Sequence, residues 1–182
     1  MKKRAFDVIF SFLGLLFTAP FIFIFWIIAT MDTKSNGFFR QERIGQFGTV
    51  FRIYKIRTIK NNSANHISSI GKFLRKSKID EVPQLFNVFI GDMSIVGPRP
   101  DISGYYDLLS GENRKILELK PGITSSASLK YFNEEELLNC QENPQKYNDE
   151  IIFPDKVKMN LDYYYNQSLL LDLKIITKTI FH

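Results

Sequence analysis

An uncharged apolar run near the N-terminus constrains the fold of this chain more than any other feature. The run extends from Val8 to Met31, 24 residues that include no Asp, Glu, Lys or Arg. As a straight helix it would be about 36 Å long, which exceeds the roughly 30 Å of a bilayer's hydrocarbon core. Hydropathy alone therefore predicts a transmembrane helix.

Two features favour instead a helix–break–helix that enters one leaflet and returns. Pro20 follows Ala19 in the middle of the run, and an internal proline removes a backbone hydrogen bond and kinks a helix. Thr18 can bond back to the Gly14 carbonyl at this break. Basic residues lie on both sides of the run, so the positive-inside rule gives no preference for crossing. A plain spanning helix is the alternative, whereas a signal peptide is disfavoured because the run is too long and no small-residue cleavage site follows. We expect residues 1–36 to form this membrane hairpin and its junction.

The remainder, residues 37–182, is long enough for one domain with a core. The net charge of +5 indicates an anionic partner such as lipid head groups or nucleotide phosphates. Nucleic acid is a weaker expectation, because the charge excess is modest and no recognition motif is present. The single cysteine, Cys140, cannot form an internal disulfide. The sequence contains no Cys/His cluster, so a zinc site is not expected.

Local patterns after the apolar run predict a small sheet and several helices. Alternating residues predict strands at Phe38–Ile44 and Thr49–Thr58, joined by a hairpin turn at Gly45–Gly48. A short basic helix is expected at Ile70–Lys78, and helical apolar spacing extends over Val157–Ile180, which suits either an interfacial or a core helix. We therefore expect an α+β fold that is mainly helical, with a small β-hairpin or sheet.

The stretch Ser77–Pro100 places two adjacent carboxylates, Asp80 and Glu81, just before an apolar helical run. Pro83 tolerates only the first turn of a helix, and Ser77 with Asp80 fits an N-terminal capping pair, so we expect this dyad at a helix start. Adjacent residues diverge by about 100° on an ideal helix, so both can face one site only at an irregular start. The alternative is that the two residues only cap the helix.

Basic side chains accompany the dyad. Arg75 precedes it by five residues, Arg99 lies between two prolines that restrict its backbone, and strand alternation points Lys55 and Arg57 the same way. Fixed cations beside carboxylates suit chemistry on a phosphorylated substrate. They hold the phosphates and should lower the carboxylate pKa values, so that a nucleophile stays ionised. A solvated strand face and an exposed turn are the alternatives.

The segment DEVPQLFNVFIGDMSIVGPRP, residues 80–100, resembles the core signature of the bacterial sugar transferases, the monotopic phosphoglycosyl transferases that act on polyprenol phosphate. FRIYKIRT at residues 51–58 and LKPGIT at 119–124 resemble two further family motifs. The family pattern has arginine where Lys120 stands, glycine at Ser125 and usually serine at Ala19. The resemblance runs from Lys3 to about Ile180 and matches the small type that consists of the catalytic domain.

The resemblance implies an enzyme on the cytoplasmic face of a bacterial inner membrane, with a re-entrant N-terminal hairpin. It would move a sugar-1-phosphate from a nucleotide sugar, expected to be UDP-linked, to polyprenol phosphate, and UMP would leave. Asp80 would attack the sugar-linked phosphorus, while Glu81 would bind Mg²⁺ or handle a proton. Direct transfer in a ternary complex stays open. The residues expected to bind substrate phosphates are Arg75, Arg99, Lys55, Arg57 and Lys120.

A membrane-anchored, non-catalytic binding or scaffold protein of a glycan pathway is the alternative function. Release of UMP from a nucleotide sugar separates the two. The sequence leaves open the sugar, the polyprenol length, the glycan pathway and whether the chain forms homo-oligomers.

Overall fold

The computed structural model describes residues 2–60 and 67–181. Contacts divide the chain into two compact units, here called unit 1 (residues 1–43 and 50–94) and unit 2 (residues 44–49 and 95–182). The described residues are mostly helical with two two-stranded sheets, which confirms the expected mainly helical α+β class. The boundary predicted after residue 36 divides a membrane hairpin and its junction from the rest of the chain, and it stays a prediction.

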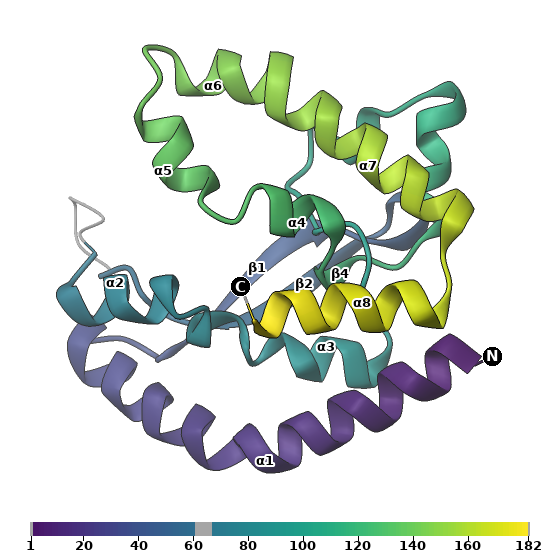
Figure 1. The fold of residues 1–182 in the computed structure, drawn as a ribbon. Coiled ribbons are helices and arrows are strands. Elements are labelled where there is room, and N and C mark those ends of the chain that lie inside the picture. Colours follow the sequence, from purple (N-terminus) through teal and green to yellow (C-terminus); the bar gives the residue numbers. More distant parts are fainter. Residues whose placement is uncertain (1, 61–66, 182) are drawn as a thin grey trace. The chain divides into compact units, whose positions relative to one another are not determined.

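Helix α1 (Lys2–Thr33) opens unit 1 and is long and apolar enough to cross a membrane. The helix continues through Ala19 and Pro20 without the expected break, and Figure 1 shows it as a bent helix. Proline removes only one backbone donor, and the residues around it keep the helical conformation, so the helix bends rather than ends. Thr18 Oγ1 donates to the Gly14 carbonyl over 2.7 Å, as predicted. The re-entrant topology itself stays a prediction.

A β-hairpin and two short helices complete unit 1. Strands β1 (Phe38–Ile44) and β2 (Val50–Ile56) pair where the sequence predicts a hairpin, and α2 (Ser69–Lys76) matches the predicted basic helix. Helix α3 (Gln84–Ile90) packs along α1 (Figure 1). The core contains one buried residue from each of α1, β2 and α2, namely Ala29, Ile56 and Leu74.

Two contacts fix α3 against α1. A Cβ atom at Gly14 would lie 3.1 Å from Leu85 Cδ1, so the glycine permits a close approach of the two helices. Nearer the N-terminus, Arg4 Nη1 and Nη2 donate to the carbonyls of Val88 and Phe89 over 2.6 and 2.8 Å. These carbonyls lie in the last turn of α3, at the end of a helix where a cation is favoured, and the Val88 carbonyl also accepts from the Gly91 backbone N–H over 3.1 Å. The N-terminal helix is thereby bound to the helix that follows the dyad.

Unit 2 is mainly helical, with a second small sheet. Strand β3 (Ser94–Val96) pairs with β4 (Gly122–Thr124), and a Cβ atom at Gly122 would lie 2.1 Å from the Gly97 nitrogen, so only glycine fits this crossing. The remaining elements in chain order are 3-10 segments at Gln46–Gly48, Tyr106–Leu108 and Gly111–Glu118, then α4 (Ser126–Lys130), α5 (Glu134–Asn139), α6 (Pro144–Tyr147), a π-helical turn at Asn148–Ile152, α7 (Phe153–Asn166) and α8 (Leu169–Ile180).

The run predicted over Val157–Ile180 is helical but divides into α7 and α8. Gln167 leaves the helical conformation, and the Ser168 hydroxyl accepts from the Leu171 backbone N–H as the N-cap of α8. Apolar periodicity continues across such a break, which explains why it does not reveal the division.

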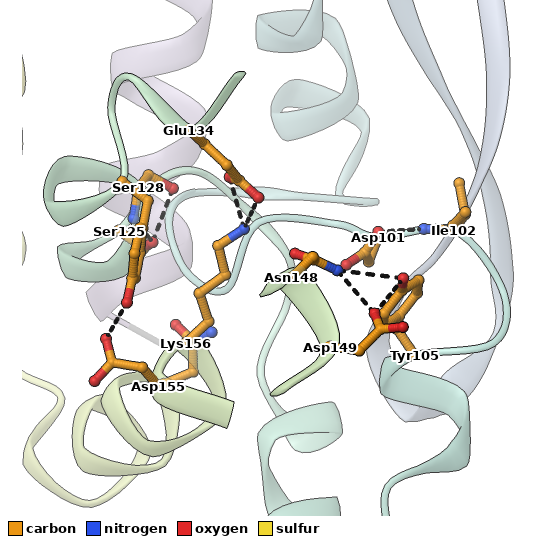
Figure 2. A network of polar contacts seen from close by, with 12 residues as sticks. Asp101, Ile102, Tyr105, Ser125, Ser128, Glu134, Asn148, Asp149, Asp155 and Lys156 are labelled. Atoms are coloured by element: carbon orange, nitrogen blue, oxygen red, sulfur yellow. Dashed lines mark hydrogen bonds and ion pairs between the residues drawn. The ribbon is translucent and has the colours of Figure 1, made fainter. Parts of the chain in front are cut away.

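Side-chain bonds hold the helices of unit 2 together. The buried Tyr163 hydroxyl of α7 donates to Asp172 of α8 over 2.5 Å. Figure 2 shows a second tie, in which Lys156 of α7 donates to both carboxylate oxygens of Glu134, the first residue of α5. Figure 2 also shows a hydrogen bond from the Tyr105 hydroxyl to Asp149 of the π-helical turn. This bond ties the residue just before the 3-10 segment Tyr106–Leu108 to that turn.

Candidate active site

The dyad lies on a tight turn between two helices of unit 1. Helix α2 ends at Lys76, and Lys78 adopts a left-handed backbone conformation with a φ of 55°. One 3-10 turn, Ile79–Glu81, carries both carboxylates, and α3 begins only after Pro83. The expected irregular geometry before a helix is therefore present.

The predicted capping role of Ser77 is wrong. Its hydroxyl donates to the carbonyls of Phe73 and Leu74 over 2.8 and 3.2 Å and so belongs to the end of α2. A serine side chain readily reaches the carbonyls of the preceding turn. Asp80 is not the N-cap of α3 either, because Pro83 holds that position without a side-chain hydrogen bond.

Both carboxylates of the dyad are buried. Asp80 is 8% exposed and Glu81 is 9% exposed, which is rare for acidic residues. Lys55 of β2 donates to Glu81 Oε1 over 3.0 Å. Within residues 2–60 and 67–181, the buried Asp80 Oδ1 has no hydrogen-bond partner. A buried acceptor without a partner is unfavourable in the folded state, so its presence points to a functional use.

Burial, followed by the negative charge of Glu81, raises the pKa of Asp80 to about 6. The positive charges of Lys55, Arg75 and Lys78 lower the pKa by less. The cations lower the pKa of Asp80 as predicted, but desolvation outweighs their attraction, so the expectation of a net low pKa is wrong. At pH 7.5 most Asp80 side chains are still ionised.

Arg57 does not share the position of Lys55. Strand β2 ends at Ile56, so the alternation that would place both basic side chains on one face stops before Arg57. The Arg57 guanidinium donates to the carbonyls of Asn36 and Phe38, over 2.8 and 3.5 Å, at the turn before β1. Its phosphate-binding role stays a prediction.

Arg99 and Lys120 belong to unit 2, which brings their two loops together. Gly122 N donates to the Pro98 carbonyl over 2.8 Å, and a Cβ atom at Gly97 would lie 2.3 Å from the Lys120 carbonyl oxygen. The GPRP and KPGIT segments thus form one backbone feature. The phosphate-binding roles of Arg99 and Lys120 stay predictions.

Sequence reasoning missed Asn87, which is fully buried in the middle of α3. Its side-chain amide bonds the backbone of β2 at Arg52 and Tyr54. A signal was present, because one asparagine interrupts the apolar residues between Leu85 and Ile90, and a polar group on a core face needs partners.

The dyad suits a magnesium ion held partly by substrate. No cluster of three or more His, Cys, Asp or Glu side chains that could hold a metal occurs in the described part of the chain. Mg²⁺, however, is usually bound through one or two carboxylates together with substrate phosphates and water. Two adjacent buried carboxylates, one with an unpartnered oxygen among the described residues, fit that kind of site.

Comparison with known families matches the family model described as bacterial sugar transferase, over residues 1–182. The chain belongs to the bacterial sugar transferase family. This confirms the resemblance drawn from residues 80–100.

Several curated proteins resemble this sugar transferase. A Bacillus subtilis protein named putative undecaprenyl-phosphate N-acetylgalactosaminyl 1-phosphate transferase is 38% identical over 110 residues, 54% of this chain and 62% of the relative. The uncharacterized sugar transferase EpsL of the same organism is 32% identical over 98% of this chain and 85% of the relative. The Klebsiella pneumoniae UDP-glucose:undecaprenyl-phosphate glucose-1-phosphate transferase is 32% identical over 98% of this chain but only 39% of its own length. The sugar transferase chain thus spans less than two thirds of the first and third of these relatives.

Proposed function

We propose that this sugar transferase moves a sugar-1-phosphate from a UDP-sugar to polyprenol phosphate and releases UMP, as the first membrane step of glycan assembly. The names of two relatives, which describe sugar-1-phosphate transfer involving undecaprenyl phosphate, support this proposal. The observation that carries it is the buried Asp80 carboxylate, whose Oδ1 has no partner in the described residues and which adjoins the Lys55–Glu81 ion pair. A nucleophile beside a fixed cation is what attack on a phosphate requires.

In the first step, Asp80 attacks the sugar-linked phosphorus of the donor. The carboxylate oxygen forms a bond to that phosphorus, the bond from phosphorus to the bridging oxygen breaks, and UMP leaves with the electron pair. In the second step, an oxygen of polyprenol phosphate attacks the same phosphorus, and Asp80 leaves as a carboxylate. Two steps let one site serve a soluble donor and a lipid acceptor in turn.

The neighbouring charged residues stabilise the phosphate oxygens. Arg75 offers a planar guanidinium for phosphate, and Lys55 holds Glu81 in place. Arg99 and Lys120 are proposed as further phosphate ligands from their family motifs. Glu81 is the proposed protein ligand for Mg²⁺, which when bound neutralises charge on the diphosphate.

We also propose that α1 is re-entrant and keeps the enzyme on the cytoplasmic face of the inner membrane. Both ends of α1 contact other elements of unit 1. Arg4 bonds the end of α3, and Asp32 accepts from Ser68, the N-cap of α2, over 2.5 Å. A helix that spanned a bilayer would separate its ends by about 30 Å of hydrocarbon, so contacts of both ends with one unit support the re-entrant arrangement.

The exposed surface of unit 1 supports contact with lipid. Large apolar side chains on α1 and α3 face outward, an arrangement that marks a membrane or partner interface. They include Ile9, Phe12, Leu16, Phe17, Phe21, Phe23, Ile24, Phe86, Phe89 and Ile90.

A panel of UDP-sugars tests the activity. Enzyme in lipid nanodiscs with polyprenol phosphate and Mg²⁺ should release UMP from at least one of them. Asp80→Asn should abolish this release, whereas Asp162→Asn, at an exposed aspartate of α7, should leave it unchanged. Absence of UMP release with every donor would favour the scaffold function.

Trapping separates the two-step mechanism from direct transfer. Enzyme mixed with a radiolabelled UDP-sugar, without polyprenol phosphate, should retain a phosphosugar on the peptide that contains Asp80. Normal turnover by Asp80→Asn would refute the nucleophile assignment. Full activity of the unmodified enzyme with no label on that peptide would support direct transfer.

A further inference from the structure

Asn87 binds the edge of β2 by a pair of hydrogen bonds that imitates a neighbouring strand. Its Nδ2 donates to the Arg52 carbonyl over 2.7 Å, and its Oδ1 accepts from the Tyr54 backbone N–H over 3.1 Å. These two backbone groups flank Ile53 and point to the same edge of the strand. A side-chain amide offers a donor and an acceptor in one plane, as a peptide unit does.

This bond pair occupies a strand edge that the sheet leaves open. In the described residues β2 pairs with β1 alone, and Asn87 covers the other edge with none of its own surface exposed. Asp92 Oδ2 lies 3.4 Å from Asn87 Nδ2 and favours the amide orientation that makes both bonds. No other standard side chain of this length supplies both partners.

The register that Asn87 sets determines where Lys55 stands. Lys55 follows Tyr54 directly and donates to Glu81 Oε1 over 3.0 Å. The dyad joins α3 through Pro83, so α3 and the dyad keep a fixed relation. A slip of one residue along β2 would move Lys55 by about 3.3 Å and turn it to the opposite face of the strand. The bond to Glu81 would then be lost.

We infer that Asn87 is a positioning residue, which holds β2 and α3 in register so that the Lys55 ammonium meets Glu81 at the dyad. It acts through Lys55 and does not itself touch substrate. This inference rests on the proposed function, because the Lys55–Glu81 pair matters for turnover only if the dyad is catalytic.

Asn87→Asp tests the role with little change in shape. It keeps the acceptor for the Tyr54 N–H, removes the donor to Arg52 and places a second carboxylate beside Asp92. Asn87→Asp/Asp92→Asn removes that repulsion without restoring the donor, and therefore controls for destabilisation. The kcat and KM for UMP release are measured per folded enzyme in nanodiscs.

We expect both variants to lose about tenfold or more in kcat, with the KM for the UDP-sugar changed by less than about threefold. Their effects should not add to that of Lys55→Met, because the variants act through the same ion pair. Recovery of kcat in the double variant, or full additivity with Lys55→Met, would reduce Asn87 to a stabilising role and overturn the inference.

Amide hydrogen exchange separates this inference from the proposed function. Asn87→Ala should speed exchange of the Tyr54 amide by about tenfold or more, whether or not the enzyme is active. An unchanged Tyr54 exchange rate would show that the two hydrogen bonds from Asn87 to β2, here called the clamp, do not hold the strand, and would overturn the inference. A faster rate in a protein that releases no UMP from any UDP-sugar would leave the clamp in place and overturn both its catalytic role and the proposed function.

Discussion

At the scale of single residues, Asp80 shows which of two opposing effects dominates. Burial and the adjacent Glu81 disfavour its charged form, while Lys55, Arg75 and Lys78 favour that form. Desolvation prevails, so the carboxyl has a pKa of about 6 in place of 3.8. The cations therefore do not keep the pKa low. They limit how far it rises, so that the Asp80 carboxylate is ionised at neutral pH.

The pKa of Asp80 predicts how the first half-reaction depends on pH. In the proposed mechanism only the ionised carboxylate attacks, so the rate of the UMP burst without polyprenol phosphate should fall as the pH drops through about 6. Lys55 lowers the pKa of Asp80, so Lys55→Met should move this acid limb to higher pH. Burst rates between pH 4.5 and 8.5 provide the measurement. An acid limb that stays below pH 4.5 would contradict the raised pKa.

The same shift predicts that Asp80 destabilises the folded enzyme at neutral pH. The folded pKa of about 6 exceeds the unfolded value, so the unfolding free energy falls as the pH rises through this range, as Asp80 ionises. Asp80→Asn removes this charge and should raise the free energy of unfolding at pH 7.5 by about 1–3 kcal/mol. Thermal unfolding in detergent at pH 7.5 and at pH 4.5 checks this. The gain should shrink at pH 4.5, and an equal gain at both values would point to another cause.

At the scale of elements, the short helix α3 depends on contacts made by others. It has 7 residues, too few to be stable alone. Arg4 of α1 caps its last carbonyls, and Asn87 fastens its middle to β2. The N-terminal helix therefore supports the helix that follows the dyad.

Removing the Arg4 cap should weaken this support. Arg4→Ala removes two charge-assisted hydrogen bonds to the end of α3 and should lower the free energy of unfolding by about 1–3 kcal/mol. Lys2→Ala removes the same charge from an exposed residue and should have little effect. Thermal unfolding of both variants in detergent compares them, and equal losses would show that only the N-terminal charge matters.

At the scale of the whole molecule, the proposed function depends on how α1 lies relative to the bilayer. Each end of α1 is bonded within unit 1, at α3 and at the start of α2. The proposed re-entrant helix would keep those bonds and place the dyad's unit at the membrane surface, where the proposed soluble donor and lipid acceptor can both arrive.

This topology predicts that both ends of the chain stay inside the cell. A small tag before Lys2 and a tag after residue 182 should both resist modification by membrane-impermeant reagents in intact cells and react after lysis. Labelling of the N-terminal tag in intact cells would show that α1 spans the membrane, and would also be incompatible with the Arg4 bonds to α3.

Local sequence patterns predicted the elements near the site but not the contacts between them. The β1–β2 hairpin and α2 follow from alternation and from the basic helical segment in the sequence. The Ser77 cap failed because the left-handed Lys78 redirects the chain, and nothing in the sequence indicates that conformation. The predicted strand extends past Arg57, whereas β2 ends at Ile56, because strand ends are set by their partners.

By itself, the sequence determined an apolar N-terminal helix, a mainly helical α+β fold and a carboxylate pair in a motif typical of one enzyme family. These features depend on residue type and local spacing, which the chain carries in any conformation. Only the tertiary structure decided that Asp80 is buried enough to raise its pKa, that Lys55 reaches Glu81, and that Arg4 and Asn87 hold α3. Desolvation and pairing between distant residues arise from packing, and packing exists only once the chain has folded.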